Sequence, residues 1–542
     1  MSSSSSPEPG AAAEHGSASE PEGQARPEPP SGGPDEPFPT KASAEGRADT
    51  GRAQAGADAS DTGTPDAEAP DVDDGHGRLA RLAPLLTGVA ALTALLGWVQ
   101  KQPCASASFD FVKTTTRACY TDIYPLYFVR GLNDNKVPYF DSFNGGGDLQ
   151  YVEYPVLSGA LMHVVNVLVQ PFAPDSRGMA FFNVTALLMG MLAVVTVLAT
   201  AYVAGRRSLR AGFMLALSPA LLLTAYINWD LLAVGLSALA VLAWAGRRPT
   251  WAGILLGLAI AAKFYPLLFL GPLVLLCVRA GRWRAMGWLL AGTAASWLVV
   301  NVPVMVLAWD GWIEFYSFSQ KRGIDWGSIF FILQDHGLSG LDATGRLNLL
   351  GTGTFLVLAL GIAVLALAAP RRPRLPQLLF LVVVAFMLPN KVWSPQYVLW
   401  LLPLVVLARP KLPAFVVWQA GEIIYFFGIW WYLLSVTLHT DGAELPEVLG
   451  TVAGFDLPSE GISTETYYVA LLARFVTVVL LAALVVWDIL RPSGDIVRRD
   501  GADDPAGGVL DGARDVVSLG ALRRRRSRPK PAASAPATAG AA

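Results

Sequence analysis

A single lysine interrupts the longest apolar stretch of the chain. Between Trp251 and Val278, Lys263 is the only charged side chain. An ammonium group at bilayer depth costs roughly 3 kcal/mol or more unless an anion compensates it, so this lysine points to a functional site. We expect the anion to be one that resides in the membrane, such as the phosphate of a lipid carrier, with Asp230 as a resting counter-charge. The alternative is a lysine that merely extends to the membrane surface.

Two carboxylates lie in the polar segment that follows the first apolar run. Asp122 comes where a loop would meet the membrane, a suitable place for a general base that acts on a hydroxyl acceptor. A helix-capping or solvated aspartate is the alternative. Glu153 precedes an expected helix, so it is either a second carboxylate of the site or a favourable charge at a helix amino terminus.

Further polar residues fall at the tips of expected helical hairpins, where they would face one cavity. Lys391 and Arg322 are candidates for binding phosphate oxygens beside Lys263, arginine through its two-pronged guanidinium. The segment 315–328 interleaves charged residues with aromatic ones, which suits a sugar ring, although tryptophan and tyrosine also populate membrane interfaces. The remaining site candidates are Asn228, Asp230, Asp325, Gln396 and Tyr397.

Other chemistries lack a sequence signal. The five histidines are scattered without close pairing, so no metal-ligand cluster and no cofactor are expected. No glycine-rich phosphate-binding motif opens a strand-to-helix turn. Cys104 and Cys119 share a loop that we place in an oxidising compartment, which predicts a disulfide between them, whereas Cys277 is expected to be a buried free thiol.

Composition divides the chain into three parts. The 542 residues are 53% hydrophobic and only 15% charged, which indicates a membrane protein. Residues 1–77 are rich in Pro, Gly, Ser and acidic residues and are predicted to be a disordered tail. Residues 492–542 are predicted to be a second disordered tail, whose basic cluster at 523–530 would touch anionic lipid; binding to nucleic acid is not expected.

The arginine-bearing loops predict the topology of the part between the tails. Because cytoplasmic loops are enriched in Lys and Arg, both tails are placed in the cytoplasm. Apolar runs then give an all-α, polytopic membrane protein with about twelve spans over residues 78–491. That count requires residues 154–172 to form a juxtamembrane helix on the outer surface, within one large extracytoplasmic loop at about 100–175. Smaller outer loops are expected at about 309–346 and 437–466.

Taken together, the region from Leu79 to Arg491 resembles the integral-membrane GT-C glycosyltransferases. It is most similar to actinobacterial glycosyltransferase family 87 and to the related catalytic subunit of GPI mannosyltransferase I. The motifs that carry the resemblance are Tyr120-Thr121-Asp122, Asn228 with Asp230, Lys263 with Tyr265-Pro266, and Asn390-Lys391-Val392 followed by Gln396-Tyr397 and Leu399-Trp400. The last is the most specific of them.

The resemblance implies a GT-C fold and an inverting hexosyltransferase of the plasma membrane. Its donor would be a polyprenyl monophosphate sugar, typically of mannose, and its acceptor a glycolipid, a lipoglycan or another cell-envelope molecule on the outer face. Asp122 matches the position of the catalytic base. The eukaryotic relatives have Asp-x-Asp there, whereas this chain has Asp122-Ile123-Tyr124, so the resemblance leaves a metal requirement open. A secondary transporter is the alternative, but the two halves show no repeat.

Overall fold

Long apolar helices dominate the computed structural model, which describes residues 76–145, 148–338, 344–441, 451–452, 455–456, 460–499, 501 and 503–517. Six of the described helices are long and apolar enough to cross a membrane. At 1.5 Å per residue they exceed the roughly 30 Å of the hydrocarbon layer. They are α1 (His76–Ala105), α5 (Pro174–Val203), α11 (Trp283–Leu307), α14 (Thr344–Ala368), α17 (Leu412–Asp441) and α18 (Thr464–Leu490). The chain is thus an all-α membrane protein.

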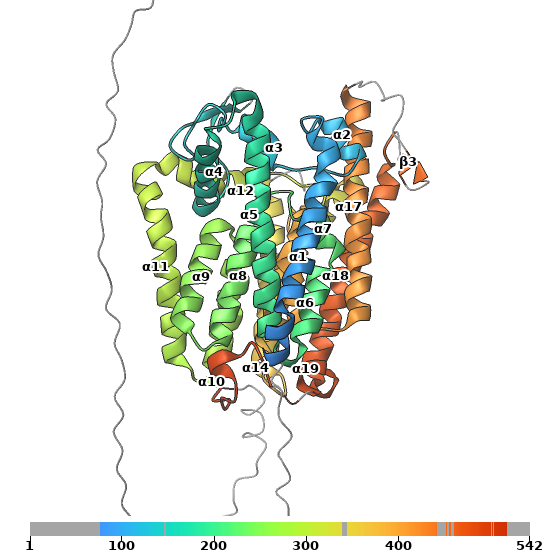
Figure 1. Ribbon diagram of the computed structural model, residues 1–542. Helices are drawn as coiled ribbons and strands as arrows, with labels where there is room; N and C mark the ends of the chain where they lie inside the picture. Colours follow the sequence, from blue (N-terminus) through green and yellow to red (C-terminus); the bar gives the residue numbers. More distant parts are fainter. Residues whose placement is uncertain are drawn as a thin grey trace, which may run out of the picture. The chain divides into compact units, whose positions relative to one another are not determined.

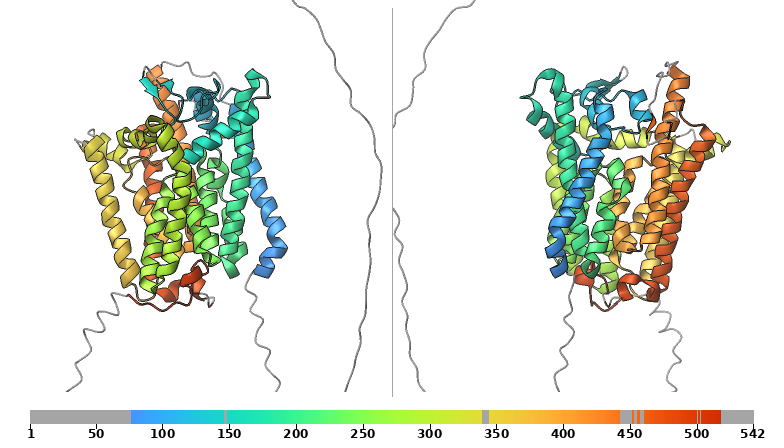
Figure 2. Two further views of the ribbon diagram at one scale, coloured as in Figure 1. Left: turned by 90° about the vertical axis from the view of Figure 1, so that its left-hand side faces the viewer. Right: turned by 45° about the vertical axis from the view of Figure 1, so that its right-hand side comes forward.

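Shorter apolar helices lie among the long ones (Figures 1 and 2). A helix of 14 residues is only about 21 Å long, so such helices end inside the apolar layer unless another segment continues them. They are α4 (Val156–Val169), α8 (Asp230–Ala245), α9 (Pro249–Ala262), η2 with α10 (Tyr265–Phe269, Leu270–Ala280), α15 (Leu375–Met387) and η3 with α16 (Pro395–Tyr397, Val398–Ala408). Six of the described helices are long enough to span the membrane by themselves. The count of about twelve membrane spans stays a prediction.

One end of the helix bundle carries most of the remaining helices, and we call it the loop-rich end (Figure 1). It holds α2 (Phe111–Thr116), α3 (Ile123–Val129), α4, α12 (Trp309–Lys321) and α13 (Ile329–Asp335). An antiparallel pair of short strands, β1 (Phe143–Gly145) and β2 (Asp148–Gln150), precedes α4. The other pair is β3 (Thr451–Val452) with β4 (Phe455–Asp456).

Small residues bring α9 against α11 and so fix the helix that ends at Lys263. A Cβ atom at Gly253 would lie 2.2 Å from the Leu289 carbonyl oxygen, and one at Gly257 would lie 2.3 Å from that of Thr293. The two glycines are four residues apart and face the same way along α9. This is the small-residue spacing that lets membrane helices pack with their backbones close together.

At the opposite end, which we call the arginine-rich end, part of the predicted tail 492–542 has defined structure. Residues 492–499 and 503–517 are folded there as η4 (Pro492–Gly494), α19 (Ile496–Arg499) and η5 (Gly508–Leu510). The chain also turns at this end after α5, through η1 (Gly205–Arg207). Helices α6 (Ser208–Ala216) and α7 (Pro219–Thr224) then lead it back toward the loop-rich end.

Ion pairs with arginines explain why this C-terminal segment is ordered. Arg374 Nε lies 2.8 Å from Asp495 Oδ2, and both side chains are only 2% exposed. Arg279 Nη2 lies 2.7 Å from Asp515 Oδ2. The sequence identifies these arginines as topology markers but not their partners. The basic cluster at 523–530 and residues 1–75 of the expected amino-terminal tail lie outside the described residues.

Replacing Arg374 by Met should destabilise the protein strongly, because it leaves the Asp495 carboxylate buried without a counter-charge. A broken buried ion pair costs about 3–5 kcal/mol. Arg371→Met is the matched control, because the Arg371 side chain is 52% exposed in its pair with Asp503, and an exposed pair contributes about 1 kcal/mol or less. Thermal unfolding in detergent measures the stability of both variants. Equal melting temperatures for the two variants would show that the Arg374–Asp495 pair does not hold the segment.

Candidate active site

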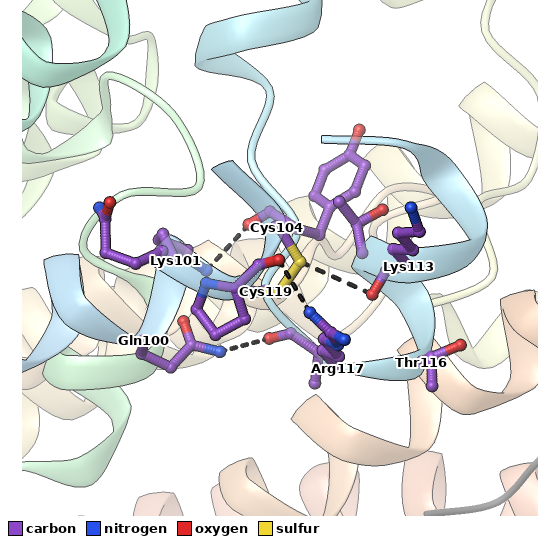
Figure 3. The surroundings of a disulfide bond; sticks show 12 residues. Gln100, Lys101, Cys104, Lys113, Thr116, Arg117 and Cys119 are labelled. Carbon is purple, nitrogen blue, oxygen red and sulfur yellow. Dashed lines mark hydrogen bonds between the residues drawn. A yellow bond between two sulfur atoms is a disulfide. The ribbon is translucent and has the colours of Figure 1, made fainter. Parts of the chain in front are cut away.

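The segment that carries Asp122 is tied to the end of α1. Cys104 and Cys119 form a disulfide with Cα atoms 6.2 Å apart (Figure 3). Lys101 donates from Nζ to the Tyr120 carbonyl oxygen at 2.9 Å, and Gln100 donates from Nε2 to that of Ala118 at 2.7 Å. Lys101 is fully buried, and its hydrogen bonds are accepted by the backbone carbonyl oxygens of Tyr120 and Leu223. The segment is therefore held from its start up to Tyr120.

The same segment lies against residues 226–228, the connection between α7 and α8. The Thr121 hydroxyl donates to the Tyr226 carbonyl oxygen at 2.7 Å, and the Asp122 backbone N–H donates to that of Ile227 at 2.6 Å. The Asp122 side chain makes no capping hydrogen bond to α3, although Asp122 is the residue before that helix. The capping role that the sequence left open for Asp122 is thus not present.

The Asp122 carboxylate is held by a tyrosine. Tyr120 donates from its hydroxyl to Asp122 Oδ1 at 2.7 Å, and the Tyr120 ring stacks on Trp430 of α17 with centroids 4.4 Å apart. Burial raises the pKa of Asp122 to about 6, although the hydrogen bond from Tyr120 and the charge of Lys263 oppose that shift. A carboxylate with this pKa is a proton acceptor near neutral pH.

Lys263 lies where the chain leaves α9. Residue 263 is extended, with φ −155° and ψ 147°, and Pro266 prevents α9 from continuing because its ring clashes with the preceding turn. The buried Ser158 hydroxyl donates to the Ala262 carbonyl oxygen at 2.7 Å. Helix α4 therefore fixes the end of α9 directly before the lysine.

The ammonium of Lys263 pairs with Asp230. Lys263 Nζ lies 2.7 Å from Asp230 Oδ1; the aspartate side chain is fully buried, whereas that of the lysine is 17% exposed. Asn228 accepts the Asp230 backbone N–H at 3.0 Å through Oδ1, which shapes the turn before α8. The ammonium of Lys263 has three donor hydrogens. One serves Asp230, which leaves two for another anion on the exposed side.

Aromatic rings surround this ion pair. Lys263 Nζ lies 5.4 Å from the centroid of the Tyr154 ring, close enough for a cation–π contact. On another side Tyr397 stacks on Trp400 with centroids 3.8 Å apart, and Trp400 stacks on Tyr265 at 4.4 Å. The charges of Lys263 and Asp230 both act on the Tyr397 hydroxyl. The rings exclude water from the pair and leave the lysine as its exposed part.

Lys391, Arg322 and Asp325 form a second charged group. Lys391 donates from Nζ to the Gln320 carbonyl oxygen at 2.9 Å, and its own carbonyl oxygen accepts the Asp325 N–H at 2.8 Å. Arg322 Nη2 lies 3.8 Å from Asp325 Oδ1, and the Arg322 side chain is 42% exposed. Burial and the charge of Arg322 lower the pKa of Lys391, whereas burial raises the pKa of Asp325.

Arg322 links the two charged groups electrostatically. Its positive charge lowers the pKa of Asp122, as that of Lys263 does. Asp122 is therefore within electrostatic range of both Lys263 and Arg322.

A buried ion pair supports the loop after Lys391. Arg474 of α18 donates to the Trp393 carbonyl oxygen at 2.8 Å and to that of Ser394 at 3.0 Å, and its Nε lies 3.1 Å from Glu422 Oε2 of α17. Gln396 is buried just beyond this loop, in η3. Neither Arg474 nor Glu422 was predicted as a site residue, although each is a charge inside a long apolar helix, the signal that singled out Lys263.

Glu153 is engaged elsewhere. Arg130 binds it through two nitrogen atoms, with Nε 2.8 Å from Glu153 Oε2 and Nη2 against Oε1. The pair joins the end of α3 to the segment before α4. Among the described residues Asp122 has no ion-pair partner, which makes it the better proton acceptor of the two. Tyr120 and Arg130 were not predicted as site residues; both lie near carboxylates that were.

Among the residues that the structure describes, no three His, Cys, Asp or Glu side chains gather as they would around a metal ion. The charged groups of the site are the Asp122 carboxylate, the Lys263–Asp230 pair, and Arg322 with Asp325 and Lys391. This arrangement suits proton removal at Asp122 and the binding of an anion by the cations.

Comparison with known families agrees with this chemistry. Residues 151–395 match the model of glycosyltransferase family 87, somewhat less than half of the chain. The match supports a membrane glycosyltransferase of the GT-C type. It includes Asp230, Lys263, Arg322 and Lys391, whereas Asp122 precedes it and Gln396 and Tyr397 follow it. No curated protein matches the chain.

Proposed function

We propose that the protein transfers a hexose, with mannose as the expected sugar, from a polyprenyl monophosphate to a glycolipid or lipoglycan acceptor. The observation that carries the proposal is a proton-accepting carboxylate, Asp122, in the electrostatic range of a membrane-depth lysine, Lys263. The family 87 match supports sugar transfer. The membrane helices favour a donor that is itself a lipid.

In the proposed reaction, Asp122 removes the proton from an acceptor hydroxyl. The hydroxyl oxygen attacks the anomeric carbon of the donor, and the bond from that carbon to the phosphate oxygen breaks on the opposite face, which inverts the configuration. The bonding electrons leave with the polyprenyl phosphate. The negative charge that develops there needs fixed cations, which stabilise it most effectively where water is excluded.

Lys263 is the proposed ligand of that phosphate, with Arg322 and Lys391 as further cations. Lys263 can keep Asp230 and still donate two hydrogen bonds, so the phosphate does not have to displace the aspartate. Arg322 is the most exposed of the three cations. We assign it to the phosphate oxygens that face the loop-rich end.

We place the site on the outer face of the plasma membrane and both tails in the cytoplasm. The site lies at the loop-rich end, and Arg279, Arg374 and Arg409 cluster at the other. Positive loops favour the cytoplasmic side, and a disulfide beside Asp122 favours an oxidising compartment. Both arguments give the same orientation.

Sugar transfer should depend on pH through Asp122. Its pKa of about 6 means that the carboxylate, the form that accepts a proton, predominates above pH 6 and is lost as the pH falls through it. We therefore expect kcat/KM to fall by about tenfold for each pH unit below 6. A rate that stays constant from pH 7 to 5 would contradict the role of Asp122.

The stereochemistry of the product tests the proposed mechanism. Purified protein would be incubated with radiolabelled β-linked polyprenyl-phosphate mannose and a membrane lipid extract. The labelled lipid should release its mannose to an α-mannosidase and resist a β-mannosidase. A β-linked product would show retention of configuration, which excludes direct attack from the opposite face and requires a different mechanism.

A further inference from the structure

A groove lies on the lateral surface of the helix bundle, between α1 and α5. Its volume is about 430 Å³, and its walls are mostly apolar. The two helices run side by side in Figures 1 and 2. Leu95, Leu187 and Met191 line it with half or more of each side chain exposed. In a membrane this groove opens toward the hydrocarbon chains.

One residue distinguishes the groove from an ordinary lipid-facing surface. Asn183 of α5 is exposed in the wall of the groove, and its Oδ1 accepts a hydrogen bond from Trp98 Nε1 at 2.9 Å. Its amide nitrogen donates no hydrogen bond to another described residue. An amide that faces hydrocarbon without a partner is costly, so a polar group of a ligand is the expected partner.

The polar and apolar parts of the groove are ordered along its length. Asn183 lies in the part of α5 nearer the loop-rich end, whereas Leu187 and Met191 follow one and two turns further from it. An amphiphile would fit with its head group at Asn183 and its chain along Leu187 and Met191. A lipid in the membrane is oriented in the same way, with its head group at the surface and its chain toward the centre.

The inner wall of the groove connects to the candidate base. Tyr226 lines the groove, and its hydroxyl donates to the Ala94 carbonyl oxygen at 2.8 Å. The Tyr226 carbonyl oxygen accepts the hydrogen bond from Thr121, the residue before Asp122. The groove and the Asp122 carboxylate are therefore on the two sides of one short segment.

We propose that this groove binds the hydrocarbon chain of a lipid-linked acceptor, whose head group contacts Asn183 and presents its hydroxyl to Asp122. The inference rests on the proposed function. The donor phosphate is assigned to Lys263 at the end of α9, and in Figure 1 helices α8 and α5 separate α9 from α1. The two lipid substrates would then reach the site from different sides of the bundle.

The groove acts mainly by orienting the acceptor. A lipid chain in the membrane is already in hydrocarbon, so moving it into the groove brings little hydrophobic free energy. A chain that is held in one place limits the positions of its head group, and such orientation accelerates a reaction between two bound substrates. Loss of the groove is thus expected to affect long-chain acceptors and to spare short, soluble ones.

Photochemical labelling tests the location of the chain without requiring turnover. The probe is a hexadecyl α-mannoside that carries a diazirine in its alkyl chain, used with the purified full-length protein. We expect the label on peptides of α1 and α5, reduced by excess unlabelled hexadecyl mannoside. Label that is confined to other helices, or the absence of competable label, would overturn the proposal.

Groove-filling variants test the effect on transfer. Ala91 lines the groove and Ala294 is an exposed alanine on α11, so Ala91→Phe and Ala294→Phe form a matched pair. The measured quantity is the ratio of kcat/KM for hexadecyl mannoside to that for methyl mannoside, at one detergent concentration. Ala91→Phe and Asn183→Leu should each lower this ratio by about tenfold, the effect of misplacing one substrate, and Ala294→Phe should leave it unchanged.

The possible outcomes separate this inference from the proposed function. A ratio in Ala91→Phe equal to that in Ala294→Phe would overturn the groove assignment while sugar transfer itself stands. Competable label on α1 and α5 without transfer to either mannoside would support the groove as a lipid-chain site and count against the proposed transferase activity.

Discussion

Asp122→Asn is expected to abolish sugar transfer, with kcat reduced by about 10³-fold, the size of a general-base contribution. Asparagine has nearly the same shape as aspartate, and its carbonyl oxygen can still accept the hydrogen bond from Tyr120. It cannot accept the proton of the acceptor hydroxyl. Donor binding should remain, because the assigned phosphate ligands are other residues. Initial rates of radiolabel transfer and equilibrium binding of the donor measure the two effects separately.

The matched control is Asp134→Asn, which removes a carboxylate from the same loop. Asp134 is exposed and accepts a hydrogen bond only from Asn133 among the described side chains. We expect this variant to transfer sugar at nearly the wild-type rate. If Asp122→Asn retained activity within about tenfold of Asp134→Asn, Asp122 would not be the base, and the proton would have to go to another group.

Lys263→Met is expected to weaken donor binding by about 10- to 100-fold, which corresponds to the 1.5–3 kcal/mol of a hydrogen bond to a charged group. The side chain of methionine fills a similar volume but provides no charge for the phosphate. The measurement is equilibrium binding of radiolabelled polyprenyl-phosphate mannose in the absence of an acceptor. Turnover then does not complicate the result.

The buried counter-charge requires a second variant. Lys263→Met leaves Asp230 uncompensated, because that aspartate is fully buried in its pair with the lysine, and an unpaired buried charge distorts or destabilises its surroundings. The double variant Lys263→Met with Asp230→Asn removes both charges. If Lys263 binds the phosphate, the double variant should still bind the donor weakly. Recovery of wild-type donor affinity would mean that Lys263 only pairs with Asp230 to shape the site.

The charged side chains of this site are easier to predict from the sequence than the residues that bind and position them. Lys263 was identifiable because one charge in an apolar run is costly, and the structure pairs it with Asp230, the partner expected for its resting state. The second carboxylate was less predictable. Glu153 is bound by Arg130, and the contact depends on how the loop between α1 and α5 folds. Local sequence does not contain that information.

The contacts of the C-terminal segment also could not be predicted from local sequence. Residues 492–517 are polar and rich in glycine and acidic residues, a composition that is typical of disorder. The order of residues 492–499 and 503–517 depends on Asp495 and Asp515, which meet arginines more than a hundred residues earlier in the chain. Such pairs are fixed by the tertiary fold. By contrast, Arg474 and Glu422 could have been found, since each is a charge within a long apolar helix.

The proposed donor is a polyprenyl monophosphate sugar, and a direct comparison of donors tests this assignment. Purified wild-type protein and Asp122→Asn would be given radiolabelled polyprenyl-phosphate mannose, polyprenyl-phosphate glucose or the corresponding nucleotide sugars, together with a membrane lipid extract. We predict transfer to lipid by the wild type from a polyprenyl-phosphate donor, loss of that transfer in Asp122→Asn, and none from nucleotide sugars. Absence of transfer from every polyprenyl-phosphate donor, together with specific solute uptake by the same protein in proteoliposomes, would contradict the account and favour a transporter.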